Sequence, residues 1–177
     1  MLKINDYKKL EYVRRCSGVP IQRNYNLVHH SYMTMILFQH FAKLEKIEYD
    51  TDVIELISLH DILETVTGDL LNPVKKFSKE TEDAWNIIEH QMLEGKERFS
   101  RFTDDEFKSK LTHEQHNLFK ACDNLELFIF LEDEIRMGNR TKEVRYIFDK
   151  VFDVVMKYGV ESINRYMCDN LVERVAK

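Results

Sequence analysis

Four polar side chains stand among otherwise apolar residues, and their types could bind a metal ion. His60 and Asp61 interrupt the apolar segment 53–63, while His30 and Asp123 lie on apolar faces of two other predicted helices. A buried, unpaired carboxylate strongly destabilises a fold unless something neutralises it. Neutral imidazole and carboxylate together suit zinc, cobalt, manganese or iron. Any one of these residues alone could equally be a satisfied core residue, so the predicted metal site rests on the whole set.

Two further acids follow the His-Asp pair. Glu64 lies one helical turn after His60, which places its carboxylate on the same side of a helix. Asp69 comes directly after Gly68, where that helix is expected to end, so we place it at the rim of a cleft. A metal ion lowers the pKa of a water molecule, and a nearby acid can relay the proton. The pattern indicates a hydrolytic centre. The alternative, a non-catalytic helical binding module held together by a metal, has no use for these acids.

The rest of the sequence predicts an all-α protein that can position these residues. Hydrophobic residues make up 44% of the 177 residues, and the chain has only 5 glycines and 2 prolines. We therefore expect residues 1–177 to form one domain, a bundle of six or seven helices. The segment 50–67 is apolar on almost all sides, which predicts the central helix of the bundle. The expected helices cover residues 5–16, 26–46, 50–67, 78–99, 112–137, 141–158 and 160 to the end.

Charge, cysteines and hydropathy exclude several classes of protein. The formal net charge of −5 argues against a nucleic-acid partner, because such binding requires basic patches. The three cysteines are odd in number and widely spaced, which is typical of reduced thiols rather than of a disulfide framework. The apolar runs are too short to span a bilayer, and the first residues do not resemble a signal peptide. These features predict a cytoplasmic protein without a membrane partner.

One stretch of the sequence is specific enough to identify a family. Residues 60–75 read HDILETVTGDLLNPVK. The pattern H-D-x-x-E-x-x-T-G-D-x-x-x-P-V-K resembles the HD-domain metal phosphohydrolases, in particular the bacterial 5′-deoxynucleotidases and related phage deoxynucleotide phosphohydrolases. His30-Ser31, the run Lys-Ala-Cys-Asp-Asn-Leu around Asp123, and Arg15 upstream fit the same branch. The resemblance covers residues 11–136 and implies an HD-type helical bundle.

The resemblance also implies a role for each candidate residue. The metal ligands would be His30, His60, Asp61 and Asp123, and the ion would be cobalt, zinc or manganese, with magnesium possible. Glu64 would handle the nucleophilic water, and Asp69 would stand near the leaving oxygen and the sugar. Arg15 would bind the phosphate of the substrate, and Lys75 is a second candidate for substrate binding. The resemblance further implies a homodimer or larger homo-oligomer.

The sequence departs from the family pattern at two positions. His29 stands where the nucleotidases commonly have a glutamate before the histidine ligand, so the expected acid next to His30 is missing. Cys16 stands where they tend to have a tryptophan that packs on the nucleotide. Selectivity for base and sugar therefore does not follow from the resemblance.

The function expected from these observations is hydrolysis of the 5′-phosphate of a deoxynucleotide. The alternative within the family is a phage-type enzyme that removes the whole triphosphate, for example from dATP. Hydrolysis of a nucleotide alarmone or a cyclic nucleotide is a more distant alternative, against which the segment TGDLLNPVK argues.

A phosphate substrate also requires a fixed positive charge. Two histidines and two aspartates leave a divalent ion formally neutral, so an arginine should face the phosphate. The candidates are Arg14, Arg15 and Arg23, which flank the predicted break at 17–20. On a helix, the side chains of Arg14 and Arg15 would point about 100° apart, so at most one should face inward. The resemblance selects Arg15.

Overall fold

The protein is all-helical in the part of the chain that the structure describes, which confirms the predicted fold class. The computed structural model describes residues 2–69, 77–93 and 97–175, and within these ranges the only β-type pairing is a single bridge between Arg14 and Asn26. The α-helices are α1 (Ile4–Lys9), α2 (Leu27–Glu45), α3 (Thr51–Ser58), α4 (Glu64–Thr67), α6 (Lys79–Leu93), α7 (Asp104–Lys110), α8 (His113–Arg136), α9 (Lys142–Lys157) and α10 (Glu161–Val175). Two short 3-10 helices cover Leu10–Tyr12 and Glu97–Phe102.

The two longest helices begin and end at signals that the sequence carries. The side chain of Asn26 accepts a hydrogen bond from the backbone N–H of His29 at the start of α2, at 3.0 Å. Lys46 ends α2 in the left-handed conformation. Thr112 and Gln115 form a reciprocal capping box at the start of α8, as predicted. These signals place both helices within a residue or two of the expected bounds.

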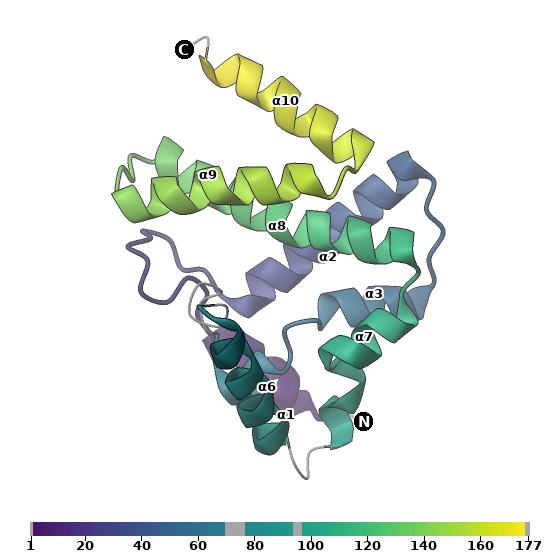
Figure 1. Cartoon of the computed structure of the whole chain (residues 1–177). Helices are drawn as coiled ribbons and strands as arrows, with labels where there is room; N and C mark the ends of the chain where they lie inside the picture. The colour runs from purple at the N-terminus through teal and green to yellow at the C-terminus, as the bar shows by residue number, and fades with distance from the viewer. Residues whose placement is uncertain (1, 70–76, 94–96, 176–177) are drawn as a thin grey trace.

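The helix α8 is the central element of the bundle. It packs along α2 on one side and α9 on another, and Figure 1 shows α9 and α10 at one end of the molecule and α1, α6 and α7 at the other. Its fully buried apolar residues include Leu118, Phe119, Leu125, Phe128 and Leu131. The prediction that the segment 50–67 would be the central helix was wrong, because it is divided into α3 and α4, and among the described helices α3 packs mainly against α2.

The predicted third helix is interrupted at the candidate ligands His60 and Asp61. The α-helix ends at Ser58, residues 59–63 form successive turns, and α4 begins at Glu64. The imidazole Nδ1 of His60 lies 2.7 Å from the carbonyl oxygen of Ile57. In a continuous helix this carbonyl would accept from the backbone N–H of Asp61, so the side chain competes with the helix for it. His60 and Asp61 therefore lie on a turn and not inside a helix. This break and the unpredicted α7 raise the helix number of the described ranges above the six or seven expected.

The predicted first helix is also shorter than expected. It ends at Lys9, a 3-10 turn follows, and residues 13–26 form a loop closed by the Arg14–Asn26 bridge. The backbone N–H of Arg15 donates to the carbonyl of Tyr25 at 2.9 Å. Neither Arg14, which forms the bridge, nor Arg15, in the bend after it, lies in a helix; Arg14 is exposed, whereas Arg15 is partly buried and pairs with Asp61. The expectation that at most one of them faces inward agrees with these positions, although the helical geometry behind it does not apply.

A buried carboxylate on α8 holds the far side of the 13–26 loop. Glu134 is fully buried and accepts hydrogen bonds from the backbone N–H groups of Gln22 (2.7 Å) and Arg23 (3.0 Å) and from the side chain of Asn139 (2.9 Å). The guanidinium of Arg23 lies over the ring of Phe130, 4.3 Å from its centroid. The loop that carries Arg15 is thus fastened to the central helix.

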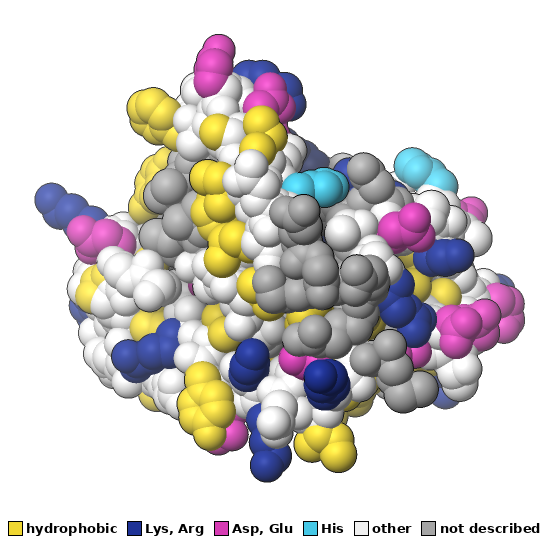
Figure 2. All heavy atoms as spheres, turned by 90° about the horizontal axis from the view of Figure 1, so that it is seen from below, with side chains coloured by type: hydrophobic (Ala, Val, Ile, Leu, Met, Phe, Trp, Pro, Cys, Tyr) yellow, Lys and Arg dark blue, Asp and Glu magenta, His cyan; other side chains and the backbone are white. Residues whose placement is uncertain are grey.

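The described surface carries both charges and apolar side chains. Figure 2 shows acidic, basic and hydrophobic side chains all present on the face seen from below. Within the described ranges, no helix is both long and apolar enough to cross a bilayer. The prediction of a single domain over residues 1–177 stays a prediction.

Candidate metal centre

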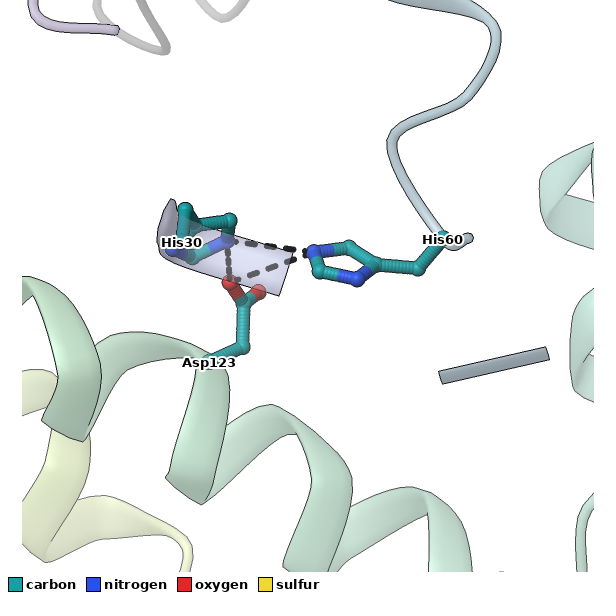
Figure 3. A group of neighbouring side chains, drawn as sticks. All are labelled: His30, His60 and Asp123. Carbon is teal, nitrogen blue, oxygen red and sulfur yellow. Dashed lines mark hydrogen bonds and ion pairs between the residues drawn. The ribbon is translucent and has the colours of Figure 1, made fainter. Parts of the chain in front are cut away.

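Three side chains from three separate segments bring nitrogen and oxygen atoms to one point (Figure 3). His30 Nε2, on α2, lies 3.2 Å from His60 Nε2, on the turn after α3. Asp123 Oδ1, on α8, lies 3.1 Å from His30 Nε2 and 3.7 Å from His60 Nε2. Such a cluster of imidazole nitrogens and a carboxylate oxygen is chemically suited to a divalent metal ion.

Asp61, the fourth predicted ligand, lies beside this group and also faces an arginine. Its Oδ2 atom is 3.3 Å from His60 Nε2 and 3.5 Å from His30 Nε2. The same oxygen accepts a hydrogen bond from Arg15 Nη1 at 2.5 Å. Three of the four predicted ligands, His30, His60 and Asp123, thus form the cluster, while Asp61 lies beside the two histidines and pairs with Arg15.

Both histidines use Nδ1 for a hydrogen bond outside the cluster, so that Nε2 of each ring faces the candidate metal position. His60 Nδ1 lies 2.7 Å from the carbonyl of Ile57, and His30 Nδ1 lies 2.6 Å from Glu126 Oε2. Since a carbonyl and a carboxylate only accept, each Nδ1 carries the proton, and in the neutral ring Nε2 offers its lone pair to the centre. Metal-binding histidines are typically held in this way. The residues present thus fit a divalent ion.

Electrostatics also favour a cation at this position. Burial raises the pKa of Asp61, but His60 and Arg15 outweigh it and hold the pKa well below its usual range. Burial likewise raises the pKa of Asp123, and hydrogen bonds from His30 and His60 bring it well below the usual value. Burial lowers the pKa of His60, whereas the two aspartates raise it to about 10. The carboxylates are therefore ionised and attract positive charge, which a divalent ion can supply in place of protons.

Of the three candidate arginines, the structure turns Arg15 toward the cluster. Its guanidinium pairs with Asp61 and lies 5.7 Å from the ring centroid of Tyr25. Burial lowers the pKa of Arg15, but Tyr25 and Asp61 raise it well above the usual value, so the side chain stays charged. Arg14 is exposed, and the guanidinium of Arg23 donates hydrogen bonds to Glu134 and to the carbonyl of Phe130 on α8.

The two predicted acids lie near Arg15. Glu64 is the first residue of α4, and its charge is close enough to raise the pKa of Arg15. Asp69 Oδ2 accepts a hydrogen bond from the backbone N–H of Cys16 at 3.1 Å, which connects this acid to the Arg15 loop. Cys16 adopts a left-handed conformation with φ of 54°. Lys75, the other predicted substrate-binding residue, lies outside the described residues.

Sequence reasoning missed two charged residues of the site, both on α8. Glu126 is 3% exposed and contacts His30 as well as His29, whose Nδ1 lies 3.4 Å from Glu126 Oε1. Burial raises the pKa of Glu126, but hydrogen bonds from His29 and His30 lower it to about 2. Lys120 Nζ lies 3.6 Å from Asp123 Oδ2. The available signal was spacing, because both residues lie three positions from Asp123 and so share its helix face.

Comparison with protein families gives a match over nearly the whole chain. Residues 4–173 match the family described as 5′-deoxynucleotidase YfbR-like. A search of curated proteins gives no match.

Solved structures share the fold at low sequence identity. An HD-domain phosphohydrolase from Listeria innocua superposes with a TM-score of 0.78 at 19% identity, covering 98% of this chain and 88% of that one. The HD phosphohydrolase DatZ of cyanophage S-2L, bound to dA and one catalytic Zn²⁺ ion, gives a TM-score of 0.62 at 14% identity, covering 96% of this chain and 98% of that one. The PH0347 protein of Pyrococcus horikoshii gives 0.66 at 14% identity, covering 92% and 95%. These likenesses confirm the HD-type fold.

We expect a divalent ion to stabilise the protein through this cluster. A ligand that binds only the folded state at 100 times its Kd adds about 2.7 kcal/mol to the free energy of unfolding. Thermal unfolding with and without Co²⁺ or Zn²⁺ should show this as a rise in Tm, and Asp123→Asn should lose most of the rise. Asp149→Asn, an exposed aspartate on α9, is the control and should retain it. Equal metal-dependent stabilisation of both variants would contradict a metal site at Asp123.

Proposed function

Because the chain belongs to the YfbR-like 5′-deoxynucleotidase family, we propose that it removes the 5′-phosphate of a deoxynucleoside monophosphate at the His30–His60–Asp123 cluster. The family and the HD-type fold make the protein a metal-dependent phosphohydrolase of deoxynucleotides. A non-catalytic binding module is thereby excluded. The substrate is a small molecule. The number of phosphates that it carries and the roles of the individual residues are proposed.

The convergence of His30 Nε2, His60 Nε2 and Asp123 Oδ1 within 3.1–3.7 Å of one another carries the proposal. Asp61 would complete the set of ligands on the side of Arg15. A divalent ion bound there lowers the pKa of a water molecule and polarises a phosphoryl group. We propose cobalt, zinc or manganese, because imidazole and carboxylate ligands suit these ions.

In the proposed mechanism, Arg15 holds the phosphate of the substrate. Its guanidinium is the cation that the described structure turns toward the cluster from the 13–26 loop, and a planar fork can bind two phosphate oxygens at once. The same guanidinium pairs with Asp61. Binding a phosphate would give the guanidinium a second anionic partner next to Asp61.

Glu64 and Asp69 would move protons on the two sides of the reacting phosphate. We assign Glu64 to accept the proton of the attacking water, because α4 begins at Glu64 and its charge lies close to Arg15. Asp69 would stand near the leaving oxygen and the sugar, held by the backbone N–H of Cys16. Both assignments are general acid–base roles, which require a carboxylate within hydrogen-bonding distance of the reacting atom.

The cytoplasmic location and a homodimer or larger homo-oligomer stay predictions. The exposed apolar side chains Val28, Tyr32 and Ile36 follow one another at four-residue spacing along α2, which would suit contact with a second copy.

Phosphate release from a panel of deoxynucleotides tests the substrate. With Co²⁺, Mn²⁺, Zn²⁺ or Mg²⁺, we expect inorganic phosphate and a deoxynucleoside from deoxynucleoside monophosphates. Release of intact triphosphate from dATP or another triphosphate would instead support the phage-type alternative. A protein that binds the ion but hydrolyses none of these substrates would contradict the proposal.

Replacing Glu64 separates acid–base chemistry from metal binding. Glu64→Ala should retain the metal affinity of the unchanged protein while kcat falls by about 10²–10⁴, the usual loss for a positioned acid–base group. Glu55→Ala, which removes a partly exposed glutamate of α3 that pairs with Arg101, is the matched control and should leave kcat unchanged. Near-normal turnover of Glu64→Ala would show that Glu64 does not handle the proton.

The neighbouring arginines provide an internal comparison for phosphate binding. Arg15→Ala should lose about 2–4 kcal/mol in kcat/KM, because the cation would contact the phosphate in both the ground and the transition state. Arg14→Ala, which removes an exposed side chain, should change kcat/KM little. The reverse ranking in steady-state kinetics would show that Arg14 is the phosphate-binding residue.

A further inference from the structure

Glu126 is a buried carboxylate that contacts a proposed metal ligand from behind. It is 3% exposed on α8, one turn after Asp123, and its Oε2 atom lies 2.6 Å from Nδ1 of His30. The opposite nitrogen of the same ring, Nε2, faces His60 and Asp123. Glu126 therefore touches the side of His30 that is turned away from the metal position, and the imidazole ring stands between the two.

The hydrogen bonds of Glu126 determine where His30 carries its proton. The hydroxyl of Tyr25 lies 2.5 Å from Glu126 Oε2 and 3.3 Å from His30 Nδ1. An ionised carboxylate can only accept, so both Tyr25 and His30 donate to the same oxygen. With its proton on Nδ1, the neutral His30 ring has a lone pair on Nε2, which is the form that a metal binds.

The groups around Glu126 leave the carboxylate little freedom to turn. Nδ1 of His29 lies 3.4 Å from Oε1, the oxygen that His30 does not contact. The ring of Tyr25 stacks on Phe130 with centroids 3.9 Å apart, which holds the hydroxyl in place. The backbone carbonyl of Tyr25 also accepts the N–H of Arg15. The same tyrosine thus connects Glu126 to the segment that carries Arg15.

We propose that Glu126 is a positioning residue that accepts a hydrogen bond from Nδ1 of His30, holds the ring with Nε2 facing His60 and Asp123, and so raises the affinity of the site for a divalent ion. The inference rests on the proposed metal site, and it assigns to α8 the acid next to His30 that position 29 does not supply. Glu126 itself does not belong to the cluster of ligand atoms. Its effect passes through the imidazole ring of His30.

Metal affinity, measured separately from turnover, tests this role. Co²⁺ and Zn²⁺ would be titrated by calorimetry into metal-free unchanged protein, Glu126→Gln and Glu126→Ala, and the visible absorption of bound Co²⁺ would be recorded. Loss of such an outer partner typically weakens metal binding about 10–100-fold. We expect Glu126→Ala to lie at the upper end of this range and Glu126→Gln, which keeps an acceptor oxygen but no charge, at the lower end. The Co²⁺ absorption of both variants should change.

Glu132→Gln is the matched control, because Glu132 is another buried glutamate of α8 that pairs with Arg136 instead of a histidine. It should bind metal as the unchanged protein does. Circular dichroism checks the folding of each variant, and if Glu126→Ala does not fold, the isosteric Glu126→Gln carries the test. Unchanged affinity and absorption in the folded Glu126 variants, or an equal loss in Glu132→Gln, would overturn the proposal.

His30→Ala distinguishes failure of this inference from failure of the proposed function. If the unchanged protein binds the ion and His30→Ala does not, the metal site stands, and the Glu126 variants alone decide the role of Glu126. If His30→Ala binds the ion as tightly as the unchanged protein, the proposed metal site fails, and the inference about Glu126 fails with it.

Discussion

The structure depends on the cost of keeping two ionised, largely buried carboxylates next to the apolar core of a helical bundle. Asp61 and Asp123 hold their charge within the protein, where an unpaired carboxylate would strongly destabilise the fold. The positively charged and hydrogen-bonding groups nearby offset this cost: Arg15 pairs with Asp61, and His30 contacts Asp123. The same arrangement favours a divalent cation and an anionic substrate, so stability and function draw on one set of interactions.

Two devices position the site, and both use α8. Residues at three-residue spacing place Asp123 and Glu126 on one helix face, so one helix supplies both a proposed ligand and the carboxylate behind His30. Further along the same helix, Glu134 fastens the loop that carries Arg15. The candidate metal centre and the loop that carries the proposed phosphate-binding cation are thus both held by α8. General acid–base and electrostatic catalysis require groups held in fixed positions relative to one another.

The sequence by itself determined the fold class and the main helices, and it selected the candidate residues of the site. Low glycine and proline content, capping signals at Asn26 and Thr112, and apolar periodicity are local properties, and the structure agrees with them at α2 and α8. The His60-to-Lys75 pattern identified the family, and the family match confirms it. Polar residues on apolar faces pointed to the set that the structure brings together, because a buried charge needs partners wherever it lies.

Only the tertiary structure decided how those residues are held. At the break after Ser58, the His60 side chain donates a hydrogen bond to the carbonyl of Ile57 and competes with the backbone of a continuous helix. The spacing of apolar residues in the sequence does not reveal this competition. Which arginine faces the centre depends on the bridge that closes the 13–26 loop and on contacts with α8. Glu126 was missed because its partner His30 lies 96 residues away in the chain. Helix propensities and capping act between near neighbours in sequence, whereas ion pairs and ligand geometry form between segments that meet only when the bundle packs.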